Sequence, residues 1–366
     1  MSLNENEIKI LEILKNDPFI SQKEIAEQLG LSRPSIANLI STLQDKGHIL
    51  GKPYVLKTDE YLTCVGGSSL DLTLKLQEDF LLETSNPVTT EISVGGVVRN
   101  IAKNLSQLSH KVSLMSVVGD DASGEEIINQ SRKIMEVFAT DKLKGETTGT
   151  YYAVINQKGH MEVGLANMNI NDHMNRSWIL EHKRHLSLSS WIVCDMNVSK
   201  DAIEALIEFK REENKKLAIV GVSGPKMKNC PDDLNGVDLM IVNQDESERY
   251  FKTKTNDLEK LCQMWLDKGV QKAVVTAGIN GSVFGEGKLI KKREAIIVPP
   301  EKVVDVTGAG DSFSAALISA LIHKESFEKA MLHAAITASL TIQSPLTAHP
   351  KLSKQFLKKE SKKYEI

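Results

Sequence analysis

The sequence predicts an α/β protein with a mainly parallel sheet flanked by helices, preceded by a small all-α domain. Between residues 58 and 366, apolar strand-like runs alternate with helical stretches, which is typical of parallel sheets wrapped by helices. Residues 1–57 show three amphipathic helical patterns instead. We therefore expect two domains, residues 1–57 and residues 58–366.

The first two helices of the small domain are predicted from their apolar spacing and their caps. Residues 4–15 and 22–29 each carry apolar side chains on one helical face. Ser21 is placed to cap the second helix, with Glu24 at the reciprocal position of a capping box. Gly30 suits the left-handed conformation that ends a helix.

The third helix and the segment after it complete a recognisable motif. Ser32 is expected to cap this helix, and Pro34 is tolerated in its first turn. The helix carries apolar side chains at the spacing i, i+3, i+4, i+7, namely Ile36, Leu39, Ile40 and Leu43. Residues 49–56 then predict a short hairpin. This arrangement is a winged helix-turn-helix.

The charge of the small domain is uneven, and its polarity favours DNA binding. Residues 1–32 hold three Lys against six Asp and Glu, whereas residues 33–57 hold four Lys and Arg against one Asp. The positive half contains the third helix and the wing, where phosphates would lie. The predicted DNA contacts are Arg33, Ser35, Asn38 and Lys52. Winged helices also serve as dimerisation or partner-binding modules, and this alternative stays open.

Composition excludes several classes of protein. The 45 basic and 48 acidic residues nearly cancel, so bulk charge indicates neither a nucleic-acid nor a membrane protein. No stretch reaches the ~20 apolar residues of a membrane helix, and the N-terminus lacks the apolar region of a signal peptide. Cys64, Cys194, Cys230 and Cys262 form no CxxC pair, so no zinc site or disulfide framework is expected. We expect a cytoplasmic protein.

Two segments interrupt the alternation and predict a small second sheet. Residues 147–155 and 160–166 flank a turn sequence, Asn-Gln-Lys-Gly, which is a hairpin signal. Residues 88–94 form a further short strand. We expect these strands to cover a site as a lid, with Asn167 and Asn169 placed to touch a ligand from the lid side.

The last sixteen residues carry six Lys against two Glu. Such a run is typical of a solvated helical face. We expect a solvated helical tail.

A glycine-containing turn joins an apolar strand-like segment, residues 295–298, to a long Ala/Leu-rich helix. The backbone N–H groups of Gly308, Ala309 and Gly310 can point together at an anion, and the helix start adds roughly half a positive charge. Asp311 beside this anion hole would accept a proton from an attacking hydroxyl. The alternative is an ordinary strand-to-helix turn with a first-turn acid.

Two further elements suit a polar ligand. Gly95 and Gly96 allow a close backbone approach, and Asn100 in the following helical turn would bond sugar hydroxyls. Asp71 follows a strand, in the crevice region of an open α/β sheet, and would accept hydrogen bonds from vicinal hydroxyls. A plain turn and a surface-loop acid are the respective alternatives.

Two other elements suit a nucleotide and its metal. Asn243 and Glu246 follow a strand, and their oxygens could hold a hydrated Mg²⁺. They also fit a helix cap with its capping box, and the two roles are compatible. Thr276, Gly278 and Gly281 follow another strand, where glycine allows a nucleotide to approach; the alternative is a simple hairpin turn.

With these elements in this order, residues 58–366 resemble the ribokinase-like (PfkB) carbohydrate kinases. Residues 305–311 read DVTGAGD, and the family's usual signature, DTTGAGD, differs only at Val306. The resemblance implies ATP and Mg²⁺ as cofactors, with Asp311 as catalytic base beside the anion hole. It implies a monovalent cation, K⁺, at Asp305.

The resemblance also implies the remaining binding roles. Mg²⁺ would be organised by Asn243 and Glu246. The residues along the ATP would be Asn243, Thr276, Gly278, Gly281 and Thr307. The residues around the sugar would be Asp71, Gly95, Gly96, Asn100, Asn167 and Asn169.

Within the family, the chain looks most like the pseudouridine kinases. The similarity lies in residues 95–102 (GGVVRNIA), 167–170 (NMNI) and 194–199 (CDMNVS), and similar kinases with an N-terminal helix-turn-helix exist. Two positions depart from the pattern. Ser69 stands where the NxD sugar motif has Asn, and Gly221 stands where Asp commonly precedes Pro-Val-Ser. These departures concern the nucleoside rather than phosphotransfer.

The sequence thus predicts an ATP-dependent kinase for the 5′-hydroxyl of a nucleoside or pentose, with pseudouridine as the leading candidate. The alternative is a metabolite-sensing transcriptional regulator that uses the kinase domain as its sensor. A pure sensor could lose Asp311, and this chain keeps it. A homodimer is expected, because one weakly charged winged helix would bind DNA weakly. No membrane partner is expected.

Overall fold

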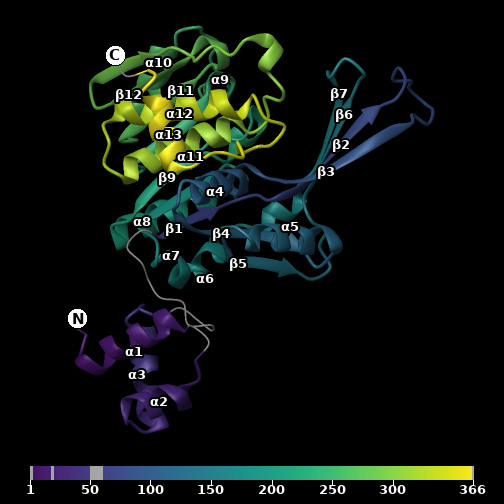
Figure 1. Cartoon of the computed structure of the whole chain (residues 1–366). Helices are drawn as coiled ribbons and strands as arrows, with labels where there is room; N and C mark the ends of the chain where they lie inside the picture. Colours follow the sequence, from purple (N-terminus) through teal and green to yellow (C-terminus); the bar gives the residue numbers. More distant parts are fainter. Residues whose placement is uncertain (1–2, 18–19, 50–60, 365–366) are drawn as a thin grey trace. The chain divides into compact units, whose positions relative to one another are not determined.

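The computed structural model describes residues 3–17, 20–49 and 61–364. The chain divides into two compact units. One comprises residues 1–61 with residues 182–190, and the other comprises residues 62–181 with residues 191–366 (Figure 1). Each unit has its own hydrophobic core, so each is described separately.

The smaller unit contains the three predicted helices. They are α1 (Glu5–Asn16), α2 (Gln22–Leu29) and α3 (Arg33–Asp45), and the short helix α7 (Lys183–Leu186) also falls in this unit. Ser21 and Glu24 form the predicted capping box, and Gly30 ends α2 with a φ of 64°. Ser32 caps α3. The apolar faces meet in a core that includes Ile10, Leu14, Ile25, Ile36, Ile40 and Leu43.

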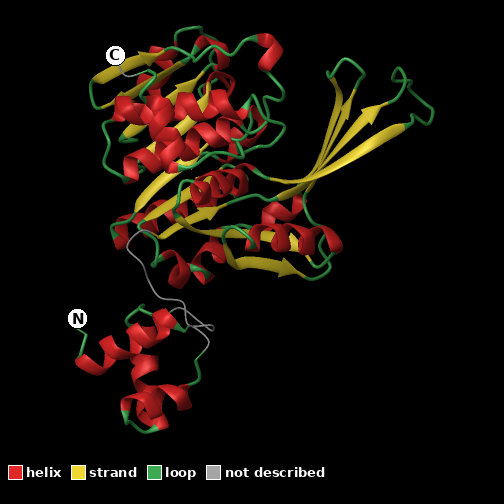
Figure 2. Ribbon diagram, viewed as in Figure 1, coloured by secondary structure: helices red, strands yellow, loops and turns green. Residues whose placement is uncertain are grey.

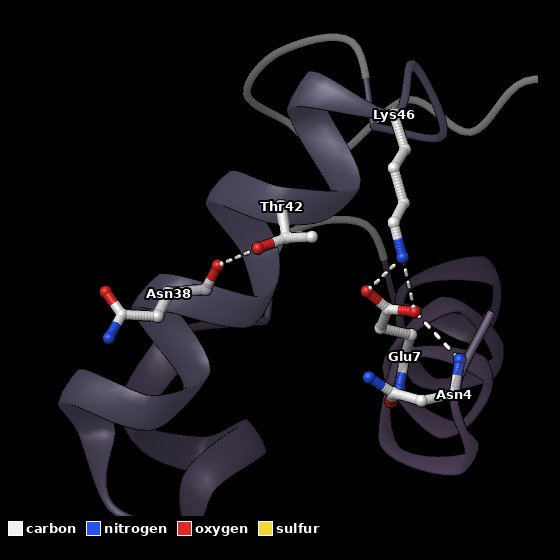
Figure 3. Close-up of polar contacts among 5 residues, drawn as sticks. All are labelled: Asn4, Glu7, Asn38, Thr42 and Lys46. Carbon is white, nitrogen blue, oxygen red and sulfur yellow. Dashed lines mark hydrogen bonds and ion pairs between the residues drawn. The ribbon is translucent and has the colours of Figure 1, made fainter. Parts of the chain in front are cut away.

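An ion pair joins the first and third helices of this unit. Lys46 Nζ lies 2.7 Å from Glu7 Oε1, and Glu7 Oε2 also accepts a hydrogen bond from the Asn4 N–H (Figure 3). The Glu7 side chain is 1% exposed, and the Lys46 hydrogen bond holds its pKa below the usual value. Lys46 is therefore committed to Glu7, and its charge adds less to a phosphate-binding face than the sequence suggested. The predicted wing and Lys52 lie outside the described residues.

The larger unit is built on a nine-stranded sheet within residues 61–364, with the order β13-β12-β11-β10-β9-β8-β1-β4-β5. The strands from β11 to β1 pair in parallel, as do β4 and β5, whereas β12 and β13 pair antiparallel at one edge. The strands are β1 (Tyr61–Val65), β4 (Lys111–Gly119), β5 (Glu136–Leu143), β8 (Trp191–Asp195), β9 (Lys216–Val220), β10 (Leu239–Asn243), β11 (Lys272–Thr276), β12 (Ser282–Glu286) and β13 (Leu289–Arg293). The predicted mainly parallel sheet is confirmed.

Helices pack along this sheet (Figure 2). For example, α4 packs on β4 and β8, α10 packs on β11 and β12, and α11 packs on α4 and α12. The α-helices are α4 (Val97–Gln107), α5 (Ala122–Arg132), α6 (Arg176–Glu181), α8 (Lys200–Glu213), α9 (Gln244–Tyr250), α10 (Leu258–Asp267), α11 (Ala309–Ile322), α12 (Phe327–Thr341) and α13 (Lys354–Ser361). Short 3₁₀ turns are η1 (Asn169–His173), η2 (Gly224–Asn229), η3 (Gly278–Asn280) and η4 (Pro300–Lys302).

A second, four-stranded sheet projects from the larger unit, with the order β3-β2-β6-β7 (Figure 1). It contains the predicted strands as β3 (Val88–Gly95), β6 (Thr150–Ile155) and β7 (Met161–Asn167). The fourth strand, β2 (Ser69–Leu76), was not expected. Asp71, which the sequence placed in the region after a strand, therefore lies within a strand that pairs with β3 and β6.

One predicted strand is wrong. Residues 295–298 form no strand, and the edge strand β13 ends earlier, at Arg293. The side chain of Ile297 is 72% exposed, so the apolar run does not enter the sheet. Pro299 and Pro300 follow directly, and proline cannot donate a ladder hydrogen bond.

Candidate active site

The carboxyl ends of the parallel strands meet at one edge of the main sheet, because parallel strands all point the same way. Asp195 ends β8, and Asn243 ends β10. Asn243 is in register with Thr276, which ends β11. Gly66 and Gly221 directly follow β1 and β9. This edge therefore gathers the polar residues that the sequence placed after separate strands.

The start of α11 is open, as an anion hole requires. Gly308 caps the helix with a φ of 78°, and a Cβ there would lie 2.7 Å from Thr347. A Cβ on Gly310 would meet no atom within 4 Å. Among the described residues, no hydrogen-bond acceptor faces the N–H groups of Gly310 and Asp311. The Ala309 N–H makes a 3.3 Å bond to the Val306 carbonyl. The unpaired backbone donors at the helix start are therefore Gly310 and Asp311, so the predicted set is shifted by one residue.

Asp311 is held by a residue from another helix. Asn100 in the first turn of α4 donates from Nδ2 to Asp311 Oδ2 at 2.9 Å, and its Oδ1 accepts from the Thr347 hydroxyl at 3.2 Å. Burial raises the pKa of the Asp311 carboxyl to about 7, and the charges of Asp195 and Asp71 add to the increase, while the Asn100 bond opposes it. Asn100, predicted to bind sugar, thus also orients the predicted base. Thr347 lies in a loop after α12, and no sequence signal indicated it.

The start of α4 lies against the beginning of the small sheet. Gly96 has a φ of 102°, and a Cβ there would lie 2.3 Å from the Gly67 carbonyl oxygen. A Cβ on Gly95 would lie 1.9 Å from Asp71 Oδ2. Close packing therefore requires glycine at both positions. The sequence had predicted glycine here only to let a ligand approach the backbone.

Asp71 is a partly buried carboxylate on β2. Its Oδ1 accepts a 2.7 Å hydrogen bond from the Ser69 hydroxyl. Burial raises its pKa, while Ser69 and the nearby Arg99 guanidinium oppose the change. Ser69, a departure from the family's motif, therefore supplies a short hydroxyl partner to Asp71. Arg99 is itself buried and donates to the Val94 carbonyl.

Asp195 is a buried acid whose role sequence reasoning missed. Its side chain is 0% exposed. Its two oxygens accept bonds from the backbone N–H groups of Gly67, Val98 and Asn197 and from Asn197 Nδ2, at 2.9 to 3.4 Å. Asp195 therefore ties the end of β8 to the loop after β1 and to the start of α4. An acid that ends an apolar strand, as in residues 191–195, was the available signal.

Asn243 and Glu246 form the predicted capping box at the start of α9. Each side chain accepts a 2.8 Å bond from the other's backbone N–H. Glu246 is 3% exposed, and burial raises its pKa to about 7. A Cβ on Gly221 would lie 2.0 Å from Glu246 Oε2, so the glycine that departs from the family's pattern leaves room for this carboxylate.

These residues fit a hydrated Mg²⁺. A buried carboxylate with a raised pKa is stabilised by a nearby cation, and Mg²⁺ usually keeps several waters and binds through one or two protein oxygens. In the part of the chain that the structure describes, no group of three His, Cys, Asp or Glu side chains could hold a metal ion. A magnesium ion here would therefore take most of its ligands from water and phosphate.

The predicted nucleotide-side residues lie at two loops. Thr276 ends β11, and Gly278 and the buried Gly281 lie in the turn to the antiparallel β12. This turn joins a hairpin, and its contact with a nucleotide stays a prediction. The Ile279 side chain at its tip is 84% exposed, which leaves an apolar surface for a flat ring. Asp305 Oδ1 accepts the Thr307 N–H at 2.8 Å, which shapes the loop before α11.

Asn167 and Asn169, which were predicted to touch a ligand from the lid side, do not lie beside Asp71. Asn167 is in register with Thr150, which is in register with Leu70. Leu70 precedes Asp71, and successive side chains of a strand point to opposite faces. Asn167 and Asp71 therefore leave the small sheet on opposite faces. Asn169 begins η1 and is exposed.

The predicted DNA contacts on α3 are exposed. Arg33, Ser35 and Asn38 all lie on the solvent side of α3, and Figure 3 shows the Asn38 carboxamide pointing away from the Glu7–Lys46 pair. The Asn38 backbone carbonyl accepts a bond from the Thr42 hydroxyl within the helix. The Ser35 hydroxyl is hydrogen-bonded to the Ser32 hydroxyl at 2.8 Å, whereas Arg33 and Asn38 extend into solvent.

Two further expectations can be compared with the structure. All four cysteines are buried and unpaired. Among the described helices, none combines the length and the apolar character that crossing a membrane would need.

The chain is similar to known kinases over most of its length. Its sequence matches the pfkB family of carbohydrate kinases over residues 59–354 and a winged helix-turn-helix DNA-binding family over residues 3–49. The uncharacterized sugar kinase YeiI of Escherichia coli (strain K12) is 28% identical over 96% of this chain and 97% of its own length. The pseudouridine kinase of the same organism is 26% identical over 81% of this chain and 95% of its own.

Solved structures agree with these sequence matches. A putative sugar kinase from Clostridium perfringens has a TM-score of 0.71 and 26% identity, and covers 84% of this chain and 96% of its own. A ribokinase of Arabidopsis thaliana, complexed with ribose and ATP, has a TM-score of 0.69 at 18% identity over 83% of this chain and 99% of its own, which shows the shared fold. Since the family match spans most of the sequence, the chain belongs to the pfkB family of carbohydrate kinases, enzymes that transfer phosphate to a hydroxyl group.

Proposed function

We propose that this kinase phosphorylates the 5′-hydroxyl of a nucleoside or pentose with ATP as donor, and that pseudouridine is its substrate. The observation that supports this most is the Asp311 carboxylate, which lies at the open start of α11 with a pKa raised to about 7. A base with a pKa near the working pH is ionised often enough and still takes a proton effectively.

The acceptor would bind between the small sheet and the start of α4. Asp71 offers a carboxylate oxygen there, since only Oδ1 is engaged by Ser69. Vicinal ribose hydroxyls are suited to such an acceptor. Asn100 would bond a sugar hydroxyl while holding Asp311 at 2.9 Å, which brings the acceptor hydroxyl to the base.

The donor's phosphates would lie at the start of α11. The unpaired N–H groups of Gly310 and Asp311 and the helix dipole provide positive potential there. Asn243 and Glu246 would hold Mg²⁺ through water, and this ion would neutralise charge on the phosphates. Thr276, Gly278, Gly281 and Thr307 would line the rest of the nucleotide.

The chain's own groups then account for the transfer. Asp311 would accept the proton of the attacking hydroxyl while that oxygen bonds to the γ-phosphorus of ATP and the bond from this phosphorus to the ADP oxygen breaks. The N–H groups of Gly310 and Asp311 stabilise the charge that develops on the equatorial oxygens. Asn100 keeps the carboxylate facing the hydroxyl, so the reacting groups meet with little reorganisation.

Pseudouridine is proposed from the three sequence runs shared with pseudouridine kinases and from the 26% identity to the Escherichia coli enzyme. The test is an ATP-consumption assay with pseudouridine, uridine, inosine and ribose at matched concentrations. We expect the highest kcat/KM for pseudouridine. A clear preference for ribose or inosine would contradict the proposed substrate while leaving the kinase assignment intact.

We also propose that the helix-turn-helix region binds DNA and that the chain regulates transcription in response to its ligand. The exposed Arg33, Ser35 and Asn38 and the family match over residues 3–49 support this. A gel-shift with fragments of the chain's own locus, with and without nucleoside, should show salt-sensitive binding. A shift that is equally strong on unrelated DNA would argue against a specific regulator.

A homodimer is proposed from the small sheet. The register brings Ile92, Leu72, Tyr152 and Leu165 into one row across its four strands. Ile92 and Leu165 are 63% and 56% exposed, so this face would bury apolar surface against a second copy. Light scattering of the full chain and of an Ile92→Lys variant should show a dimer and a monomer, respectively.

A monovalent cation such as K⁺ is proposed beside Asp305. One oxygen of this exposed carboxylate accepts the Thr307 N–H, which leaves the other for an ion. Turnover in K⁺ should exceed turnover in a bulky organic cation, and Asp305→Asn should remove the difference. Equal turnover in both salts would exclude this role.

A further inference from the structure

A cavity of about 240 Å³ lies at the far end of α11 from the catalytic acid. Its lining comes from the end of α11, the start of α12 and one side of α13, helices that pack together (Figure 1). Asp311 lies in the first turn of α11, whereas His323 in the lining ends that helix. At 1.5 Å per residue, about 18 Å of helix separates the two.

The charge of this lining is strongly one-sided. Its charged side chains are four lysines and a single carboxylate, Lys329, Lys354, Lys358, Lys362 and Glu325. The carboxylate is already engaged, because Glu325 lies 3.9 Å from Lys329 Nζ and 3.3 Å from His333 Nδ1. Within residues 61–364, no ion pair neutralises Lys354, Lys358 or Lys362.

The three uncompensated lysines are held in place by the packing of α13. They follow one another at i, i+4 and i+8, so they share one face of the helix. Leu357 and Ser361, between them in the sequence, are buried. The C-terminal segment is therefore a docked helix rather than the solvated tail that its composition suggested. Like charges at this spacing destabilise a helix, and a bound anion would relieve that repulsion.

Two stacked histidines lie at this cavity, His323 in its lining and His110 against His323. His110 and His323 stack with ring centroids 5.2 Å apart, and His110 Nε2 lies 2.8 Å from the Ser319 hydroxyl. Burial, with the charges of His323 and Lys354, lowers the His110 pKa to about 4. The His110 ring is therefore neutral near pH 7 and leaves the charge of the lining to its lysines.

We propose that this cavity binds a small phosphate-bearing molecule, with Lys354, Lys358 and Lys362 as its charge partners. Lysine ammonium groups make charge-assisted hydrogen bonds to phosphate oxygens. The apolar side chains of Leu108 and Leu357 also line the cavity and would contact the carbon part of the ligand. A phosphomonoester of a pentose has both features, and the proposal does not depend on which alcohol the kinase phosphorylates.

The test must separate this cavity from the anion hole at the start of α11. Calorimetric titration of the full chain with ribose 5-phosphate, and with ribose as the neutral control, would be repeated in a Gly310→Val variant. That substitution fills the space at the anion hole. We expect the Gly310→Val variant to keep a ribose 5-phosphate binding event that ribose, which lacks the phosphate, does not produce at this cavity. Loss of all ribose 5-phosphate binding in this variant would overturn the proposal.

Charge-matched variants then assign the site. In the Gly310→Val background, Lys354→Gln with Lys358→Gln should weaken ribose 5-phosphate binding about tenfold or more. The control pair, Lys351→Gln with Lys359→Gln, removes the same charge from exposed lysines outside the cavity and should change affinity less than about twofold. If both pairs of substitutions lower the affinity for ribose 5-phosphate equally, overall charge explains the effect and the proposed site is wrong.

A short DNA duplex is the final probe, because DNA also presents phosphates. If the Lys354→Gln, Lys358→Gln pair weakens duplex binding and leaves ribose 5-phosphate binding unchanged, this face contacts nucleic acid and the small-ligand proposal is wrong. Circular dichroism melting of every variant confirms that the comparison is between folded proteins.

Discussion

Two acidic residues of the kinase unit, Asp195 and Asp311, differ in the number of hydrogen bonds that hold them. At the end of β8, Asp195 is completely buried and accepts four hydrogen bonds. At the start of α11, Asp311 is partly buried and accepts one side-chain bond, from Asn100. Burial raises the pKa of both carboxyls. The donors around Asp195 stabilise its charge, whereas Asp311 has few donors and open space beside it.

This difference separates a structural acid from a reactive one. A carboxylate whose lone pairs are all used cannot take a proton from a substrate without breaking those bonds. A carboxylate with one fixed partner is oriented and still has free lone pairs. Asp195 is therefore a positioning residue for the loop after β1 and the start of α4, and Asp311 is the candidate base.

The largest expected effect is on turnover. Asp311→Asn removes the proton acceptor while keeping the side-chain shape, so kcat should fall by about 10²–10⁴ with nucleoside binding largely kept. Steady-state kinetics and calorimetric binding would measure the two quantities. Normal turnover would remove Asp311 as the base.

The folding stability of Asp311→Asn is the control, because it shows whether a loss of turnover comes from unfolding. The folded protein holds the Asp311 pKa near 7, above the value of about 3.9 in an unfolded chain. Ionising Asp311 therefore costs stability as pH rises between these values. Above neutral pH, Asp311→Asn should be at least as stable as the wild type in urea unfolding.

The next effect concerns folding stability, which Asp195→Asn should lower although Asp311→Asn should not. Asp195→Asn places an amide where Asp195 Oδ2 accepts from the Val98 N–H and Asn197 Nδ2. Each donor left without an acceptor costs about 1–3 kcal/mol, so we expect a loss of at least about 2 kcal/mol in urea unfolding. If Asp195→Asn unfolds like the wild type, Asp195 does not hold these segments together.

The two glycines beside Ala309, Gly308 and Gly310, should differ in what a substitution costs. One is needed for packing and the other for space that a ligand would fill. Gly308→Ala forces a left-handed conformation and a contact with Thr347, so it should cost about 1–2 kcal/mol or more. Gly310→Ala meets no protein atom within 4 Å and should keep full stability while reducing kcat/KM. Melting temperatures and kinetics of both variants test this, and equal losses of stability would contradict an open anion hole.

The smallest effect is a shift in pH dependence. Because Asp311 works as a base only when ionised, kcat/KM should fall about tenfold per pH unit below about pH 7. Asn100→Asp replaces the amide donor by a second carboxylate and should move the midpoint upward by about one unit or more. The ionisation of ATP is common to both proteins. An unchanged midpoint would show that the titrating group is not Asp311.

Sequence reasoning succeeded where neighbouring residues along the chain decide the structure. The capping box of Ser21 and Glu24 and the left-handed Gly30 depend on residues at most a few positions away, and both were confirmed. It missed the eight-residue strand β2, which carries Asp71 and lies between β3 and β6. Leucine at positions 70, 72, 74 and 76 alternates with other residues, which was an available strand signal. It also failed where the partners are distant along the chain.

What the sequence alone determined is the local chemistry at the start of α11: a glycine-containing turn, backbone N–H groups at a helix start and an acid in its first turn. Only the tertiary structure decided how that acid behaves, because Asn100 lies 211 residues away along the chain and Thr347 belongs to a different loop. A hydrogen bond between distant segments depends on the packing of whole helices, here α4 on α11. Burial, and with it the raised pKa of Asp311, arises from that packing and from no pattern in the residues beside it.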